Sequence, residues 1–216
     1  MTEETRRQRI KSKVEEKLRP VTLPNFITLF RMAIVPFFVL AVSDRDFWLA
    51  LWIFVIAGLT DALDGWLARR FESSSLVGAY LDPLADKLLL TAALVALTVP
   101  QGQRVVIPLW LAILSLSRDF LIMLVAVVLY VVEDIHSFPP SLLGKLTTFM
   151  HVVTVCLVLL ANLAKLPTLL LSISFYAAFA LVILSGFNYI YRASRFIEAK
   201  RVAREPAASG DPSGEE

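Results

Sequence analysis

The chain has 216 residues, of which 57% are hydrophobic and only 19% are charged, with a formal net charge of +2. A soluble domain carries roughly a quarter charged residues and could not bury this much apolar surface, so the composition excludes an ordinary soluble fold. The small net charge gives no support to nucleic-acid binding. The single cysteine, Cys156, excludes a disulfide framework and a cysteine metal site.

Residues 1–20 form a basic segment, with seven Lys or Arg residues against four Glu residues. Ile10, Val14 and Leu18 recur every four residues, so a helix here would have a narrow apolar stripe on a basic body. A basic amphipathic helix of this kind suits the surface of an anionic membrane. A solvated charged tail is the alternative.

Long apolar runs follow, each close to the ~20 residues that span the hydrocarbon core of a bilayer. They predict transmembrane helices at residues 24–43, 47–69, 81–99, 106–132, 142–164 and 168–191. We therefore expect an all-α polytopic membrane protein with six transmembrane helices. Its domain would cover residues 21–197, followed by a disordered C-terminal tail at residues 198–216.

Basic residues gather on one side of these predicted spans. That side holds the N-terminal segment, Arg69, Arg70, Lys145 and the basic stretch after the last span, whereas the other holds Arg45, Arg104 and Lys165. By the positive-inside rule, both termini are cytoplasmic. We expect the chain in a bacterial inner (plasma) membrane, with anionic lipids around it.

Four aspartates lie where the second span ends and the third begins: Asp61, Asp64, Asp82 and Asp86. Spacings of three and four put each pair on one helix face, and the short connection makes the two helices antiparallel neighbours. Four carboxylates in hydrocarbon could cost on the order of 10 kcal/mol, which bound divalent metal would relieve. Oxygen ligands without His or Cys select Mg²⁺ or Mn²⁺, and four carboxylates suit two ions. A structural or proton-relay role is the alternative.

Small residues accompany the acidic positions. Gly65, Ala68 and Gly78 share faces with the aspartates, and their missing side chains would leave room for a flat or bulky ligand. The alternative for each is close helix packing. Pro83 is expected in the first turn of the third span, where its missing N–H costs little.

Together these positions spell D-x-x-D-G-x-x-A-R, eight residues, and then G-x-x-x-D-x-x-x-D. The fixed positions are Asp61, Asp64, Gly65, Ala68, Arg69, Gly78, Asp82 and Asp86. This pattern resembles the signature of the CDP-alcohol phosphatidyltransferase family, with every fixed position and the spacing matched. The resemblance extends to most of the chain, since that family is also built on six membrane helices.

The resemblance implies roles for these residues. Asp61, Asp64 and Asp82 would ligate two divalent metal ions that hold the pyrophosphate of CDP-diacylglycerol. Asp86, also at the metal site, would be the general base that takes the acceptor's proton. Gly65, Ala68 and Gly78 would make room for the cytidine, with Arg69 beside the nucleotide. The acceptor oxygen would then attack the lipid phosphorus directly, without a covalent phosphatidyl-enzyme.

Further polar side chains lie within the apolar runs. Asn25, Thr28 and Arg31 are spaced by three at the start of the first span, and we assign Asn25 and Thr28 to CDP binding. Buried cations that face one chamber would bind a phosphate other than the one that the metals hold. Arg31, Arg118 and Lys145 are therefore the candidates for a phosphate on the acceptor.

Each of these cations also has a structural interpretation. Arg118 could pair with Asp119, although sequence neighbours on a helix do not face each other. Lys145 could extend to the membrane surface. His151, in the fifth span, is interpreted as a hydrogen-bonded core histidine rather than a ligand.

The fourth and fifth spans resemble the glycerol-lipid branch of the family, which comprises phosphatidylglycerophosphate synthases and the cardiolipin synthases of the same fold. We favour glycerol 3-phosphate as acceptor because that activity is more widespread, with phosphatidylglycerol as the alternative. Asp119 departs from the first enzyme, in which Glu usually follows the Arg, and resembles the second. His151 departs from both, since Gln is commoner there. The resemblance also implies a homodimer.

Two other classes of protein use acids in membranes. An intramembrane prenyltransferase also binds a lipid pyrophosphate through Mg²⁺, and is expected to need more spans. A divalent-cation transporter would place its acids near the middle of the bilayer, whereas these four cluster at one surface. Consumption of CDP-diacylglycerol with CMP release separates the favoured interpretation from both.

Overall fold

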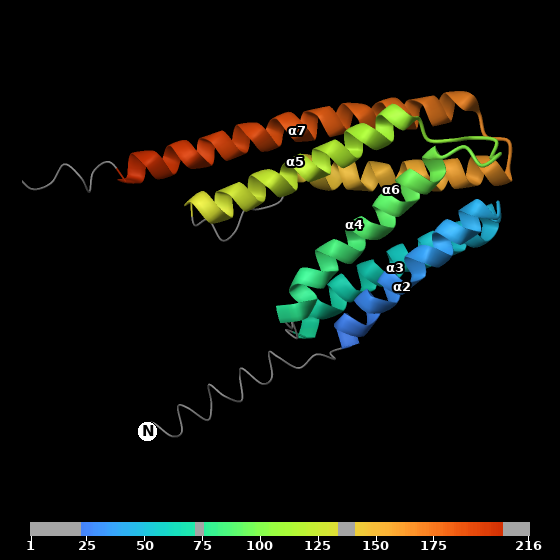
Figure 1. The fold of residues 1–216 in the computed structure, drawn as a ribbon, viewed down its shortest axis with the longest axis horizontal. Helices are drawn as coiled ribbons and strands as arrows, with labels where there is room; N and C mark the ends of the chain where they lie inside the picture. Colours follow the sequence, from blue (N-terminus) through green and yellow to red (C-terminus); the bar gives the residue numbers. More distant parts are fainter. Residues whose placement is uncertain (1–22, 72–75, 134–140, 205–216) are drawn as a thin grey trace, which may run out of the picture. The chain divides into compact units, whose positions relative to one another are not determined.

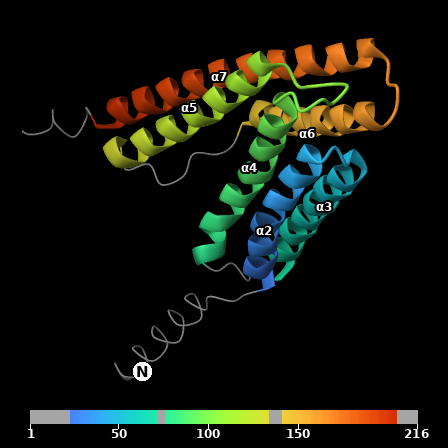
Figure 2. The same ribbon diagram turned by 45° about the vertical axis from the view of Figure 1, so that its right-hand side comes forward.

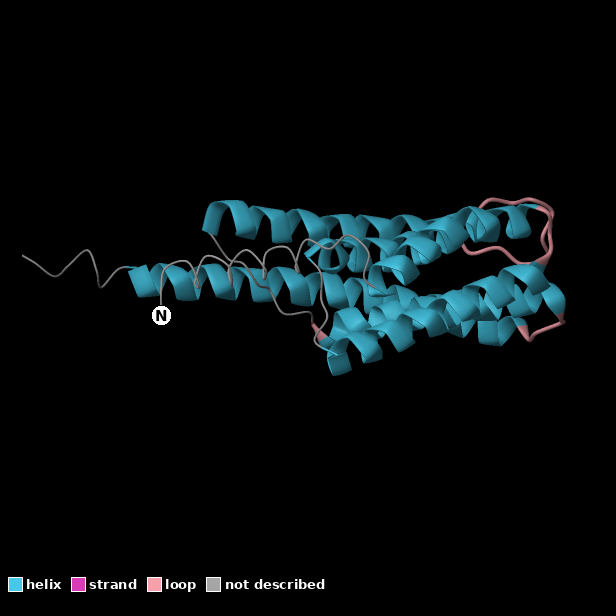
Figure 3. Cartoon of the chain, turned by 90° about the horizontal axis from the view of Figure 1, so that it is seen from below, coloured by secondary structure: helices cyan, strands magenta, loops and turns pink. Residues whose placement is uncertain are grey.

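The structure, a computed structural model, describes residues 23–71, 76–133 and 141–204. Within these ranges every regular element is an α-helix, which confirms the all-α fold class (Figures 1 and 3). The helices are α2 (Leu23–Ser43), α3 (Phe47–Phe71), α4 (Leu76–Thr98), α5 (Leu109–Glu133), α6 (Leu142–Leu163) and α7 (Thr168–Arg204). The predicted surface helix at residues 1–20 lies outside the described residues.

Each predicted span corresponds to one helix, and three boundaries differ by three residues or more. α4 begins at Leu76 rather than at residue 81, and α5 begins at Leu109, after Pro108, rather than at residue 106. α7 continues to Arg204, beyond residue 191 and beyond the domain end that we placed at residue 197. The added stretch is rich in Ala, Arg, Lys and Glu, which are good helix formers outside the membrane as well.

Two helical stretches are long and apolar enough to cross a membrane, Leu142–Leu163 and Thr168–Arg195. Shorter apolar stretches occur at Phe30–Ser43, Phe47–Thr60 and Lys87–Thr98, among the residues whose side chains are described. These findings fit a membrane protein. The six-span topology and the cytoplasmic placement of both termini stay predictions.

Large apolar side chains are exposed along the helices, among them Phe37, Trp52, Phe120, Phe149 and Phe187. In water, patches of this kind would drive association. In a bilayer they contact lipid tails, which are as apolar as the side chains themselves. The exposed surface therefore agrees with the hydropathy of the sequence.

The described helices form two compact units. The first contains α2, α3, α4 and the end of α6 from Val155 onward. Here α2 packs against both α3 and α4 (Figure 2). Small residues on α3, Ala50 and Ala57, are buried, and Phe54 contacts Phe38 of α2 with ring centroids 5.9 Å apart. Small residues let helices approach closely where no water drives them together.

Polar contacts close one end of this unit. In the turn between α2 and α3, Arg45 has a left-handed backbone with φ of 62°, and its Nε donates to the carbonyl of Gln101 at 2.8 Å. Gly102, with φ of 80°, lies under the Arg45 guanidinium, and an added Cβ would be 2.5 Å from Nη2. The left-handed backbone favours glycine there, and an added Cβ would also displace the Arg45 guanidinium.

Asn162, near the end of α6, fastens the segment before α5. Its Oδ1 accepts from the Val105 N–H at 3.0 Å, and its Nδ2 donates to the carbonyls of Val105 and Val158, both at 2.9 Å. The side chain thus satisfies both backbone groups of Val105, which has no helical partner there.

Asn162→Ala is expected to lower the free energy of unfolding by about 2 kcal/mol, because the Val105 N–H and C=O lose their partners in a half-buried place. Thermal unfolding in detergent measures the loss. Lys165→Ala, at an exposed position two residues beyond α6, is the control and is expected to leave stability unchanged. Equal melting temperatures for the two variants would contradict the assigned role of Asn162.

The second unit contains α5, α7 and α6 up to Thr154. α5 packs against α7 (Figure 1), and Trp110 of α5 contacts Tyr176 and Phe179 of α7. Buried hydroxyls donate hydrogen bonds to carbonyls of their own helix. The Thr147 Oγ1, for example, donates to the Leu143 carbonyl at 2.7 Å. In an apolar interior each polar group needs such a partner.

Candidate active site

The four aspartates lie on two continuous helices. Asp61 and Asp64 belong to the last part of α3, and Asp82 and Asp86 belong to the first half of α4. Because the backbone is helical through both pairs, residues spaced by three and four share a face. Their side chains lie outside the described part of the structure, so metal ligation and the role of Asp86 stay predictions.

The early start of α4 changes the setting of two residues. From the sequence, we expected Gly78 to share a face with Asp82 and Asp86 if this stretch were helical. The backbone at Gly78 is helical, so the three residues do share a face. Pro83, expected in the first turn, instead lies in the second turn, and that prediction was wrong. A proline inside a membrane helix is tolerated where neighbouring helices or polar groups satisfy the freed carbonyl. Pro36 inside α2 is another example.

The residues assigned to the nucleotide lie in the same unit. Gly65, Ala68 and Arg69 follow the aspartates on α3, and Asn25 and Thr28 lie in the first turns of α2. Since α2 packs against both α3 and α4, one helical bundle contains every residue assigned to CDP and metal. Side chains at these positions are outside the description, and their roles stay predictions.

Arg31 follows one turn later on α2 and is buried, with 3% of its surface exposed. A buried guanidinium on an apolar helix is costly unless hydrogen bonds or charges compensate it. Arg31 thus fits a functional site. Its proposed contact with the acceptor phosphate is not tested.

In the second unit, a polar cavity of about 210 Å³ brings two of the predicted cations together. It is lined by Arg118 and Ile122 of α5, Ser141 just before α6, Gly144, Lys145 and Thr148 of α6, and Tyr189 of α7. Ser141 caps the start of α6, because its Oγ accepts from the Gly144 N–H at 3.0 Å. Two cations and the positive end of a helix dipole favour an anion in this cavity.

Arg118 is held by a side chain of its own helix and by one of α7. Its Nη1 donates to Asp119 Oδ1 at 2.7 Å, and its Nη2 donates to the Ser185 hydroxyl of α7. Its Nε is buried and has no hydrogen-bond partner among the described residues. A buried donor without a partner is costly, which favours a functional reason for an arginine at this position.

The structure also tests the structural interpretations of Arg118 and His151, whereas that of Lys145, an exposed residue, stays a prediction. The ion pair between Arg118 and Asp119 does form, and the expectation that sequence neighbours would not meet was wrong, because the long arginine side chain bends back to the carboxylate. His151 is buried, and its Nε2 is 2.7 Å from the Ser115 Oγ of α5. It is a hydrogen-bonded core histidine, as expected.

Several lining residues were missed by the sequence analysis. Gly144 allows Arg118 to approach α6, since an added Cβ would be 3.2 Å from Nη2. Ser185 orients the guanidinium, and Tyr189 is buried in the cavity wall. Ser141 alone left a signal, namely a serine after two prolines and before an apolar helix, which is typical of a helix cap.

The acidic residues fit a hard divalent cation. Carboxylates from two neighbouring elements, with no His or Cys among them, are the ligands of Mg²⁺ and Mn²⁺. Where side chains are described, the chain contains no group of three or more His, Cys, Asp or Glu residues that could hold a metal. The aspartates of α3 and α4 therefore remain the candidates.

Comparisons with known proteins agree with the motif. The sequence model described as CDP-alcohol phosphatidyltransferase matches residues 21–187. The CDP-diacylglycerol--glycerol-3-phosphate 3-phosphatidyltransferase of Bacillus subtilis is 34% identical over 187 residues, covering 77% of this chain and 92% of that protein. The cardiolipin synthase (CMP-forming) of Streptomyces coelicolor is 34% identical over 67% of each chain. The human cardiolipin synthase (CMP-forming) is 41% identical over 52% of this chain and 36% of its own length.

Proposed function

Because this chain belongs to the CDP-alcohol phosphatidyltransferase family, we propose that it transfers the phosphatidyl group of CDP-diacylglycerol to a hydroxyl of a phosphate-bearing glycerol acceptor, with release of CMP. The motif predicted this family and a transferase of phospholipid biosynthesis, and both predictions are confirmed. The observation that carries the proposal is the match over residues 21–187, which includes both aspartate-bearing helices.

On the donor side, we assign the residues of α2, α3 and α4. Asp61, Asp64, Asp82 and Asp86 would hold two divalent ions, Mg²⁺ or Mn²⁺, which when bound supply charge neutralisation at the pyrophosphate and at the CMP leaving group. Gly65, Ala68 and Gly78 leave space beside these acids for the cytidine. Asn25, Thr28 and Arg69 supply polar contacts to the nucleotide.

The transfer itself needs one proton acceptor. The acceptor hydroxyl loses its proton to Asp86 while its oxygen forms a bond to the phosphatidyl phosphorus. The bond between that phosphorus and the bridging oxygen of CMP breaks on the opposite side. CMP leaves as a stable anion, so the reaction requires no nucleophile from the protein.

On the acceptor side, the polar cavity supports a phosphate site. Arg118 and Lys145 offer charge-assisted hydrogen bonds, and the start of α6 adds the positive end of a helix dipole nearby. Two acceptors have the required chemistry, glycerol 3-phosphate and phosphatidylglycerol. Arg31, on α2, is assigned to the same phosphate from the sequence.

Arg118→Ala is expected to raise the KM of the acceptor at least tenfold and that of CDP-diacylglycerol less than twofold. Loss of hydrogen bonds between a cation and a phosphate costs about 1.5–3 kcal/mol, and roughly 1.4 kcal/mol corresponds to a factor of ten. Initial rates of CMP release at varied concentrations of each substrate measure both constants.

Two further variants make this result specific. Arg104→Ala removes an exposed arginine from the loop before α5 and should leave both constants unchanged. Arg118→Lys keeps the charge but not the two-pronged donor, and an intermediate KM is expected. An equal rise in both constants for Arg118→Ala would count against a role confined to the acceptor.

The proposed function is tested with purified protein, labelled CDP-diacylglycerol and a panel of acceptors: glycerol 3-phosphate, phosphatidylglycerol, inositol phosphate and serine. CMP and a lipid product should form with a glycerol acceptor. Product from inositol phosphate or serine alone would overturn the assignment to the glycerol branch. Prenyl transfer, or metal uptake by vesicles without lipid substrate, would favour the rival classes.

The setting of the enzyme is also proposed. The distribution of basic residues supports six spans, with both termini and the aspartates at the cytoplasmic face of a bacterial plasma membrane. A homodimer follows from the family resemblance. Cysteine accessibility in oriented vesicles and the mass of the detergent-solubilised protein test these two points.

A further inference from the structure

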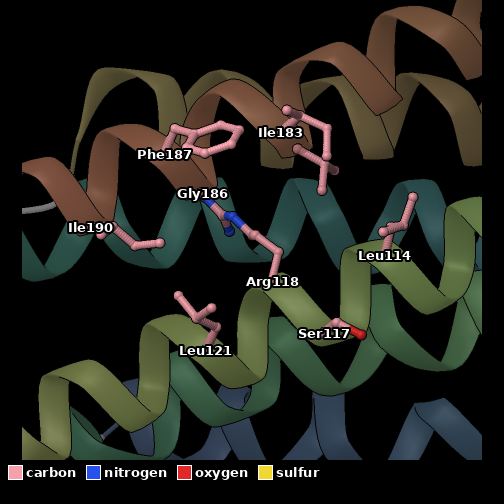
Figure 4. A pocket seen from close by; sticks show the side chains of 9 residues that line it. Leu114, Ser117, Arg118, Leu121, Ile183, Gly186, Phe187 and Ile190 are labelled. Carbon is pink, nitrogen blue, oxygen red and sulfur yellow. The ribbon is translucent and has the colours of Figure 1, made fainter.

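Arg118 borders a second cavity in addition to the polar one. A groove of about 220 Å³ lies between α5 and α7 and is lined by Leu114, Ser117, Arg118, Leu121, Val182, Ile183, Gly186, Phe187 and Ile190. Figure 4 shows Arg118 extending from α5 towards Gly186 of α7. One guanidinium-bearing side chain therefore forms a wall of both the polar cavity and the groove.

The groove is suited to hydrocarbon. Apart from Ser117 and Arg118, its walls are aliphatic side chains, one phenyl ring and a glycine. Its volume exceeds the ~150 Å³ of an apolar protein cavity that holds benzene. At Gly186 the groove has free space, since a Cβ added there would meet nothing within 4 Å. A small water-soluble acceptor would make no use of this space.

We propose that the acceptor is an anionic phospholipid with a glycerol headgroup, such as phosphatidylglycerol, whose phosphodiester binds Arg118 and Lys145 and whose acyl chain lies in the groove between α5 and α7. In such a lipid a few bonds separate the phosphate from the acyl chains. The polar cavity and the apolar groove meet at Arg118 in the same order, with a place for the phosphate next to a place for an acyl chain. The inference rests on the proposed function and chooses between its two acceptors.

The groove acts by orientation rather than by burial. An acyl chain in a bilayer already lies in hydrocarbon, so moving into the groove gives little transfer free energy. An acyl chain held beside Arg118 would instead fix the orientation of the phosphodiester. The free glycerol hydroxyl would then point away from the groove. Orientation of the reacting group is a recognised source of rate.

The first test compares acceptors. In vesicles that contain CDP-diacylglycerol, the wild-type protein is expected to use phosphatidylglycerol at least ten times faster than glycerol 3-phosphate at equal concentrations. CMP release with glycerol 3-phosphate and none with phosphatidylglycerol would overturn the inference and leave the proposed function standing. Failure with both acceptors would overturn the two together.

The second test fills the groove. Gly186→Leu is expected to raise the KM of phosphatidylglycerol at least tenfold and to leave the KM of CDP-diacylglycerol within twofold. Ala180→Leu, which adds a similar side chain to an exposed part of α7 outside the groove, should behave as the wild type. Unchanged kinetics in a folded Gly186→Leu protein would contradict the groove's role.

The third test needs no variant. Phosphatidylglycerol with a photoreactive diazirine on one acyl chain is expected to crosslink to peptides of α5 and α7. Unlabelled phosphatidylglycerol should compete with the label at least tenfold better than phosphatidylcholine, which lacks a net negative charge. Equal competition by the two lipids would make the groove an ordinary lipid contact and overturn the inference.

Discussion

Replacing Asp86 with asparagine is expected to lower kcat by a factor of ~10²–10⁴ while CDP-diacylglycerol still binds. A positioned general base contributes about this much to a proton transfer, and an amide of the same size cannot take the proton. CMP release at saturating substrate measures the loss, and equilibrium binding of labelled CDP-diacylglycerol measures the retained affinity. The helical position of Asp86 on α4, one turn after Asp82, is kept by this isosteric change.

Asp44→Asn is the matched control, since Asp44 is an exposed carboxylate in the turn between α2 and α3. It should show wild-type kcat and wild-type binding. Near-normal turnover in the Asp86 variant would remove Asp86 from the role of base. Loss of both turnover and lipid binding would instead indicate that Asp86 serves chiefly as a metal ligand.

Asp61→Asn, Asp64→Asn and Asp82→Asn are each expected to lower kcat/KM by ~10³ or more. A divalent ion held by carboxylates at the transferred phosphate stabilises the transition state by several kcal/mol. About 1.4 kcal/mol corresponds to a factor of ten in rate. An amide oxygen is a weaker ligand, so the variants should also require a higher concentration of Mg²⁺ or Mn²⁺. Activity measured across a metal titration reports both effects.

The same experiment contains its own check. Excess chelator should abolish wild-type activity, and added Mg²⁺ or Mn²⁺ should restore it. A wild-type preparation that is fully active in chelator would remove the metal from the proposed chemistry. A variant whose metal requirement is unchanged would place that aspartate outside the metal site.

Helix positions were largely readable from the sequence, because an apolar run of span length has few other uses. The misplaced boundaries have local causes. The start of α4 was set too late because its first turns, around Gly78 and Asp82, are less apolar than the rest. The end of α7 was set too early because a helix can leave the membrane without ending, and hydropathy reports only the membrane-embedded part.

The proposed acceptor site was less accessible to sequence reasoning. Arg118 and Lys145 could be proposed because a cation within an apolar run is costly and needs a reason. Ser185 and Tyr189 look like ordinary residues of an apolar helix in the sequence. Their place beside Arg118 depends on the packing of α5 against α7, which residue spacing along one helix does not reveal.

Spacing along single helices was enough to indicate the class of protein and to locate the acidic motif through which the chain resembles its family, since periodicity and composition are properties of one segment at a time. The packing of α5, α6 and α7 was needed to show that Arg118 separates a polar cavity from an apolar groove. Cavities form between helices distant in the chain, and their walls are set by how side chains of different helices meet. The acceptor that we propose depends on that contact.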